Sequence, residues 1–223
     1  MAGTITSLQV QKHNRDRVNI YVDGVFAVGT AVILAAGLKV GQYLSDADLA
    51  RLKDRDNVEQ AHEAALNLLS YRPRSESEIR RALQKRDAPD EVVDVVVERL
   101  TSAGLLNDLE FARYWIENRS QFRPRGLRAL QYELREKGIS EAVAAQALAQ
   151  VNEQTAARKV AADAMHRFRR TPPADLRRKV ITYMARRGFS YETIAPLVEE
   201  MLEMGSVQRE NLADIESEEK DNG

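Results

Sequence analysis

Three segments of the chain share one pattern at a nearly constant spacing. They are residues 78–100 (EIRRALQKRDAPDEVVDVVVERL), 129–151 (ALQYELREKGISEAVAAQALAQV) and 179–201 (KVITYMARRGFSYETIAPLVEEM). The matched positions are Leu83, Leu134 and Met184, then Asp87, Gly138 and Gly188, then Ala88, Ile139 and Phe189, and finally Leu100, Val151 and Met201, with spacings of 51 and 50 residues. A period of this length is typical of repeat proteins, in which each unit buries its apolar face against a neighbour.

Each segment reads as helix, turn, helix, and a further helix precedes it. In the first unit, Val93, Val96, Val97 and Leu100 lie at i, i+3, i+4 and i+7, which predicts one face of a helix. A valine-rich run can also form a buried strand. We favour the helix because the charged residues of this run, Asp94, Glu98 and Arg99, then fall on the opposite face.

Glycine, serine and proline residues mark the turns. Gly104, in LTSAGLLNDLEF, is placed to end a helix in the left-handed conformation, with Leu105 and Leu106 folding back beyond it. Gly138 and Gly188 end helices in the same way, and Ser140 and Ser190 follow them as caps. Ser75 and Glu78 have the spacing of a capping box.

The first 58 residues have a different character. Residues 4–29 predict three short strands, and Asp23-Gly24 is a strong signal for a two-residue hairpin turn. Residues 31–38 predict a short helix. Ser45 is the expected cap of a longer helix. That helix can continue through residues 49–70, and a break, where one occurs, is expected at Asn57.

The predicted fold is therefore mainly α, with tandem three-helix repeats in a curved array and a small N-terminal β-hairpin region. We divide the chain into a strand and helix region over residues 1–58, three-helix repeats over residues 59–107, 108–155 and 156–203, and an acidic disordered tail over residues 204–223.

Composition excludes several classes of site. Cysteine is absent, so the chain has no disulfide, thiolate zinc site or cysteine nucleophile, and the three histidines have no ligand-like spacing. Neither a phosphate-binding loop nor an acid/base pair is recognisable, so we predict no enzyme and no cofactor. The longest apolar stretch, VFAVGTAVILAAGL, is too short to span a membrane. We expect a cytoplasmic protein with no membrane partner.

Charge is distributed unevenly although the net charge is −1. Residues 155–203 carry ten Lys or Arg against six Asp or Glu, whereas residues 204–223 carry two against six. A basic region followed by an acidic tail is typical of polyanion binding under self-restraint, and equally of a solvated chain end.

Arginines next to aromatic residues and prolines are the most informative feature for function. Arginine can hold phosphate bidentately and can stack on bases or aromatic rings. The candidate contact residues for a protein partner or DNA are Arg72, Arg74, Arg119, Arg123, Arg125, Arg128, Arg167, Arg169, Arg170, Arg177, Arg178, Lys179, Arg186 and Arg187. Scattered solvated charge is the alternative that composition leaves open.

Three motifs resemble the RecX family of recombinase regulators. They are Leu-Leu-x-x-Arg-x-Arg-Ser at residues 68–75, Gly-Leu-Leu-Asn-Asp-x-x-Phe-Ala at residues 104–112, and Leu-x-x-Lys-Gly-Ile at residues 134–139. The positions that match the family's motifs are Arg72, Arg74, Asn107, Asp108, Phe111 and Ala112. The resemblance implies tandem three-helix repeats that bind the RecA filament and modulate its ATPase and strand-exchange activities.

Two hypotheses for function follow. The first is a non-catalytic regulator that binds the RecA filament and inhibits it, and that is a monomer when free. The second is a helical-repeat protein that binds DNA, single- or double-stranded, without sequence preference. The same arginines would serve both, by contact with an acidic protein surface or by neutralising phosphates.

Overall fold

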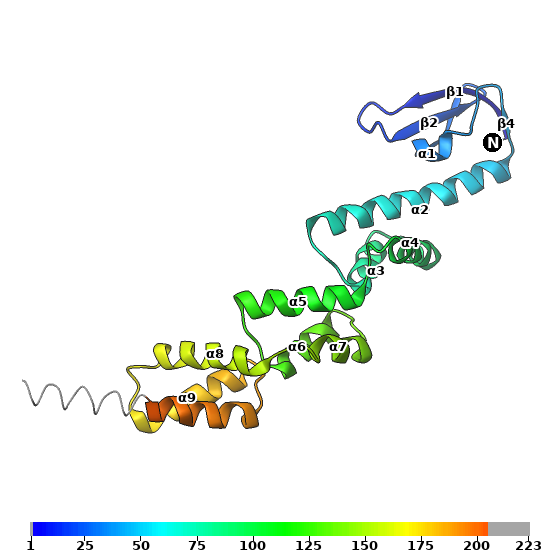
Figure 1. Ribbon diagram of the computed structural model, residues 1–223. Coiled ribbons are helices and arrows are strands. Elements are labelled where there is room, and N and C mark those ends of the chain that lie inside the picture. Colours follow the sequence, from blue (N-terminus) through cyan, green and yellow to red (C-terminus); the bar gives the residue numbers. More distant parts are fainter. Residues whose placement is uncertain (1, 205–223) are drawn as a thin grey trace, which may run out of the picture. The chain divides into compact units, whose positions relative to one another are not determined.

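The structure is a computed structural model that describes residues 2–204 of the 223-residue chain (Figure 1). Apart from Met204, the predicted acidic tail lies outside the described residues. The chain divides into two compact units, Met1–Asn107 and Asp108–Gly223.

The first unit begins with a four-stranded antiparallel sheet in the order β3-β2-β1-β4. Its strands are β1 (Gly3–Val10), β2 (Arg17–Val22), β3 (Val25–Ala31) and β4 (Tyr43–Leu44). Asp23 and Gly24 form the β2–β3 turn with φ of 48° and 82°, the left-handed pair that a two-residue hairpin requires. The three predicted strands are confirmed, and the short β4 was missed because two residues carry no alternation.

The segment between β3 and β4 differs from the prediction. Helix α1 covers only Val32–Ala35, although the sequence predicts a helix over residues 31–38. The chain turns after Ala35, where the Leu38 amide donates to the Ala35 carbonyl at 3.0 Å, and Leu38 packs against the sheet core. Burial of Leu38 thus outweighs continuation of the helix.

Helix α2 (Asp46–Tyr71) is one uninterrupted helix, so of the two possibilities the helix continues and the break at Asn57 does not occur. Ser45 and Asp48 form the expected capping box at its start, and the hydrogen bonds from Ser45 lower the pKa of Asp48 to about 2. Leu49 and Leu52 pack against the sheet, whereas Ala61, Ala64 and Ala65 pack in the first repeat. One helix therefore serves two cores.

Asp56 explains why the helix continues. Its buried carboxylate accepts hydrogen bonds from the Ala31 amide at 2.8 Å, from Nη2 of Arg17 at 2.8 Å and from Nε2 of Gln60 at 2.6 Å. Aspartate near asparagine usually favours a cap or turn. Here the side chain is used to attach α2 to the edge of β3, so the contact with the sheet overrides the local preference.

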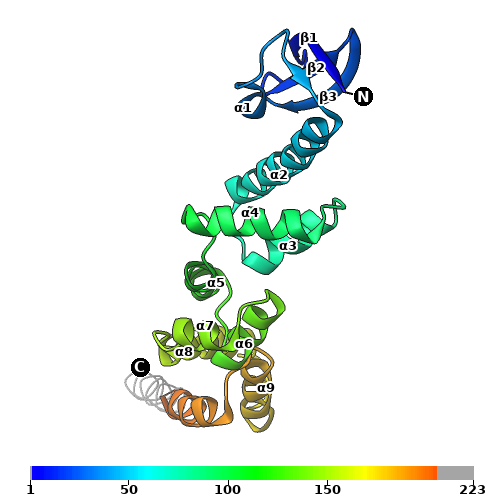
Figure 2. The same ribbon diagram turned by 90° about the vertical axis from the view of Figure 1, so that its right-hand side faces the viewer.

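The rest of the first unit is the first three-helix repeat. The second half of α2 packs with α3 (Glu76–Gln84) and α4 (Asp90–Ser102) (Figure 2). Val93, Val96, Val97 and Leu100 are all buried, which confirms the helical interpretation of the valine-rich run. Ser75 accepts a hydrogen bond from the Glu78 amide at 3.2 Å, as its spacing predicts.

The second unit contains two further three-helix repeats. One is built from α5 (Asp108–Phe122), α6 (Leu127–Glu136) and α7 (Glu141–Leu148). The other is built from α8 (Glu153–Arg167), α9 (Pro173–Ala185) and a helix described over residues 191–204. Each repeat has its own apolar core, and the predicted mainly helical fold with tandem three-helix repeats and a small N-terminal sheet is confirmed.

All three repeats close the turn between their second and third helices in the same way. Asp87, Gly138 and Gly188 take φ of 59°, 79° and 86°. The following amide reaches back to the aligned Leu83, Leu134 or Met184 carbonyl, at 3.3, 3.0 and 3.4 Å. This is the Schellman arrangement, and it satisfies carbonyls that the helix end leaves unpaired.

Gly104 also takes the predicted left-handed conformation, with φ of 70°. Only one of the two leucines beyond it folds back, because Leu106 is 3% exposed and Leu105 is 53% exposed.

Within residues 2–204, no helix is both long enough and apolar enough to cross a bilayer.

We predict that Asp56→Ala separates the sheet from α2. Removing one partner of a buried ion pair leaves the charge of Arg17 without its carboxylate and lowers the free energy of unfolding by roughly 3–5 kcal/mol. Asp54→Ala changes an exposed carboxylate on the same helix and is the matched control. Amide hydrogen exchange of β3 should accelerate in Asp56→Ala alone; equal exchange in the two variants would contradict the role of Asp56.

Candidate functional site

The two candidate arginines of the first unit make hydrogen bonds within their own repeat. Arg72 donates to both carboxylate oxygens of Glu78, at 2.9 and 3.1 Å. Nε of Arg74 donates to the Leu68 carbonyl at 3.1 Å. These contacts fix the turn between α2 and α3, which accounts for the two arginines of that motif in structural terms. Phe111 and Ala112, from another motif, are buried in the core of the second repeat.

Arg119 and Arg125 belong to a cluster around Glu133. Oε2 of Glu133 accepts hydrogen bonds from Nε of Arg119 at 2.6 Å and from Nε1 of Trp115 at 2.9 Å. Arg125 Nε lies 3.5 Å from Oε1 of the same carboxylate, and this buried nitrogen has no hydrogen-bond partner among the described residues. The Arg119 guanidinium also lies 4.3 Å from the centroid of the Trp115 ring.

Most candidate residues of α9 and the preceding turn contact their own repeat. Arg177 binds Glu199 at 2.7 Å, and the hydrogen bonds that it makes with Glu199 and Tyr191 raise its pKa. Arg178 binds Asp175, Lys179 binds Thr171, and Arg169 binds His166. Arg167 lies 5.9 Å from the centroids of Phe168 and Tyr183. Arg170 is exposed and has no side-chain contact of these kinds in the described chain.

The structure brings two distant arginine runs together at a contact between backbones. The Gly126 amide donates to the Arg187 carbonyl at 3.0 Å. A β-carbon at Gly126 would lie 2.3 Å from the Gly188 oxygen, and one at Gly188 would lie 2.4 Å from the Ala129 β-carbon. Only glycine at both positions allows this approach of α6 to the end of α9.

We call the arginines within three residues of this contact the basic seam. They are Arg123, Arg125, Arg128, Arg186 and Arg187. Arg187 stacks on Tyr183 at 3.9 Å, and Arg125 is near Glu133. The exposed side chains of Arg123, Arg128 and Arg186 have no hydrogen bond, ion pair or ring contact within the described part of the chain. The basic seam therefore offers cations to a partner.

Glu153 also links the second and third repeats at this junction. One carboxylate oxygen accepts from the Leu127 amide, at the start of α6, at 2.8 Å, and the other accepts from the Thr193 hydroxyl at 3.0 Å. Both oxygens are thus occupied by groups from two repeats. The carboxylate also sits favourably at the positive end of α6.

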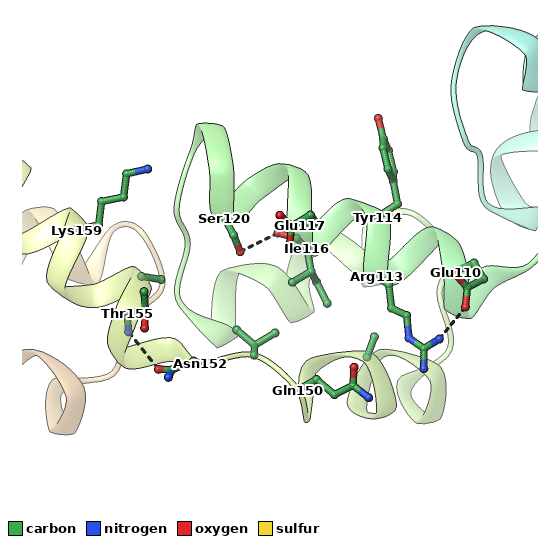
Figure 3. Close-up of a pocket in the computed structure, with 13 residues that line it drawn as sticks. Glu110, Arg113, Tyr114, Ile116, Glu117, Ser120, Gln150, Asn152, Thr155 and Lys159 are labelled. Atoms are coloured by element: carbon green, nitrogen blue, oxygen red, sulfur yellow. Dashed lines mark hydrogen bonds and ion pairs between the residues drawn. The ribbon is translucent and has the colours of Figure 1, made fainter.

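A cavity of about 660 Å³ lies between α5, α7 and the start of α8 (Figure 3). Ile116 and Val151 contribute apolar surface to it. Several of its polar groups already have partners: Arg113 binds Glu110 at 2.7 Å, Asn152 caps α8 at Thr155, and Lys159 donates to the Gln121 carbonyl at 3.3 Å. The cavity can hold a small apolar group, but these interactions leave the basic seam as the stronger candidate site.

All five arginines of the basic seam are among the candidates predicted from the sequence, but no sequence pattern joins residues 123–128 to residues 186–187. Gly126 within the arginine run FRPRGLR is the one local sign of this contact, and the sequence indicates its partner Gly188 only as the end of a helix. Glu153 and Trp115 were missed, since neither stands in a recognisable motif.

Four family models match the chain. They are the regulatory protein RecX N-terminal domain over residues 3–45 and the first, second and third three-helix domains of RecX over residues 61–100, 107–148 and 152–197. The chain belongs to the RecX family.

Relatives and solved structures agree with this assignment. The regulatory protein RecX of Listeria innocua is 33% identical over 197 residues, which is 84% of this chain and 72% of that protein. That of Bacillus subtilis is 29% identical over 219 residues, 96% of this chain and 81% of that protein. A crystal structure of regulatory protein RecX is 28% identical, has a TM-score of 0.73, and covers 91% of this chain and 99% of that one.

The crystal structure of RecX from Lactobacillus salivarius shares the fold. It is 23% identical, has a TM-score of 0.61, and covers 67% of this chain and 99% of that one. Membership of the RecX family gives this chain a regulatory role. The family models also separate an N-terminal domain from the repeats, which places the sheet and the basic seam in different domains.

Gly188→Ala and Gly104→Ala form a matched pair that tests the junction. Both glycines have positive φ, so each alanine carries a similar backbone strain of roughly 1–2 kcal/mol. At Gly104 the new β-carbon meets nothing within 4 Å, whereas at Gly188 it meets Ala129. We expect Gly188→Ala to lose roughly 1–3 kcal/mol more in thermal or urea unfolding. Equal losses would mean that the close approach at Gly188 contributes no stability.

Proposed function

We propose that this chain regulates RecA by binding the RecA–DNA filament, and that it inhibits ATP hydrolysis and strand exchange. Membership of a regulatory family over all four domains supports a regulatory role. The basic seam supports an anionic partner, because three of its arginines are exposed and have no partner of their own within residues 2–204. The proposal keeps the predicted domain boundaries, which follow residues 58, 107, 155 and 203.

The basic seam suggests how contact is made. Its arginines come from two repeats, and the Gly126–Gly188 contact with Glu153 holds those repeats together. A fixed spacing between cations lowers the entropy lost when a partner binds. Arg123, Arg128 and Arg186 are therefore the residues that we expect to contribute most to binding, ahead of Arg177 and Arg178, which already have carboxylate partners.

The DNA-dependent ATPase activity of RecA tests the proposal. RecA on a fixed amount of single-stranded DNA is titrated with this protein, and excess DNA is added as a control for simple competition. We expect inhibition at substoichiometric ratios that survives the excess DNA. No effect, or one abolished by added DNA, would contradict action on the filament.

A charge-reversed pair locates the contact. Arg123→Glu/Arg186→Glu should raise the concentration needed for inhibition roughly five- to ten-fold, because rim charges contribute modestly each and reversal adds repulsion. Lys53→Glu/Arg55→Glu makes the same charge change on exposed positions of α2 and is the control. If both variants inhibit RecA as the parent does, the basic seam is not the contact surface.

Sequence-nonspecific DNA binding is the second candidate function, and the exposed arginines of the basic seam are the observation that favours it. It predicts an affinity for bare DNA that falls with salt, by roughly 0.7–0.9 in the log–log slope per phosphate contacted. Arg123→Glu/Arg186→Glu should then lower that slope. A salt-independent affinity would count against this function.

A further inference from the structure

The outer face of the N-terminal sheet is a surface that the regulatory role does not account for. Residues on β1, β2 and β3 alternate between two faces. Ile5, Ile20 and Val28 point into the core with Leu49 and Leu52 of α2. The strand register places the opposite side chains in rows across the three strands, Ser7, Tyr21 and Phe26 in one row and Gln9, Asn19 and Gly29 in the next.

An aromatic pair stands at one end of this face. Tyr21 and Phe26 lie opposite each other on β2 and β3, with ring centroids 6.0 Å apart and an interplanar angle of 76°. Phe26 is 52% exposed. Phe26 lies on the edge strand β3, beside the β2–β3 turn, and its exposed apolar surface gains hydrophobic free energy when a partner covers it. A half-exposed aromatic ring can stack on a nucleic-acid base.

The middle of the face carries two amide side chains, Gln11 and Asn19. Nε2 of Gln11 donates to Oδ1 of Asn19 at 2.8 Å. Both atoms lie above Gly29, where a β-carbon would come within 3.0 Å of Gln11 and 3.3 Å of Asn19. Glycine therefore lets the amide pair lie close to the sheet. The remaining hydrogen-bond donors and acceptors of these amides can bond to the edges of bases.

Basic side chains without a partner in the described residues lie at the other end. The β1–β2 loop carries Lys12, His13 and Arg15, all exposed, and none of their side chains has a hydrogen bond or ion pair in the described residues. The loop joins β2 at Arg17, which is four residues from Tyr21 on the same strand. The loop therefore begins about 13 Å from the aromatic pair. β1, β2 and β3 contain no Asp or Glu, and Asp16 is the one acidic residue of that loop.

We propose that this face binds single-stranded DNA, with a base stacked on Phe26 and backbone phosphates held by Lys12 and Arg15. A stacking platform beside a cationic rim is the arrangement by which proteins hold single strands without reading sequence. A basic or neutral peptide would gain nothing from the rim cations. Duplex DNA hides its base faces and cannot use Phe26. The choice of DNA over RNA rests on the proposed function.

Fluorescence anisotropy with a labelled oligothymidylate tests the stacking. The full chain is used in the Arg123→Glu/Arg186→Glu background, so that binding at the basic seam is suppressed. Phe26→Leu keeps the apolar bulk and removes the ring, and should weaken binding roughly ten-fold, whereas Phe26→Tyr should bind as the parent does. Ile33→Ala, which removes an apolar side chain that is 74% exposed on α1, should have no effect. Equal affinity of the Leu and Tyr variants would overturn the proposal.

The same assay tests the cationic rim. Lys12→Glu/Arg15→Glu should weaken binding and lower the salt slope by about 0.7 for each phosphate that the variant no longer neutralises, relative to Lys53→Glu/Arg55→Glu. Indistinguishable affinities of these two variants would refute the role of the loop. A duplex of the same length should bind less tightly than oligothymidylate; tighter binding of the duplex would also refute the proposal.

An oligouridylate arm decides between the two sources of single strands. Tighter binding to oligouridylate than to oligothymidylate would overturn the choice of DNA. RecA is absent from every arm, so the outcome is separate from that of the ATPase titration. Circular dichroism of each variant shows whether the sheet and helices remain folded.

Discussion

Each three-helix repeat depends on one residue in the left-handed conformation between its second and third helices. That residue reverses the chain so that the next side chain, Ala88, Ile139 or Phe189, returns toward the core of its repeat. Gly188 has a second role, because its missing side chain also admits Ala129 of the neighbouring repeat. The residue that closes the third repeat therefore also docks it against the second.

In the first unit, continuity comes from helix α2. The sheet and the first repeat have separate cores, and α2 contributes buried residues to both. Asp56 links them, because it satisfies an amide at the edge of β3 and the guanidinium of Arg17 while remaining inside the helix. An edge amide that a side chain satisfies is also closed to pairing with another chain. The contact thus protects the sheet as well as orienting it.

Local features of the fold could be predicted from the sequence. Helical spacing predicted α4, and Gly104, Gly138, Gly188 and Ser45 each took the predicted conformation, because such signals act within a few residues. The sequence left open whether the helix breaks at Asn57, because Asp56 is stabilised by contacts 25 and 39 residues away in sequence. The basic seam was beyond prediction for the same reason: residues 126 and 188 share no local signal. The sequence pattern predicted the arginines as candidates, but tertiary contacts decide which of them have hydrogen-bond or ion-pair partners.

Trp115 combines an indole hydrogen bond with two neighbouring cations. It is the one tryptophan of the 223 residues, its indole N–H donates to Glu133, and the cations of Arg119 and Lys137 lie 4.3 and 4.7 Å from its ring centroid. Its ring also stacks on Phe111, in the core of the second repeat. Intrinsic emission excited at the indole band is thus a local optical probe of one repeat, and it reports the loosening of that repeat without any added label.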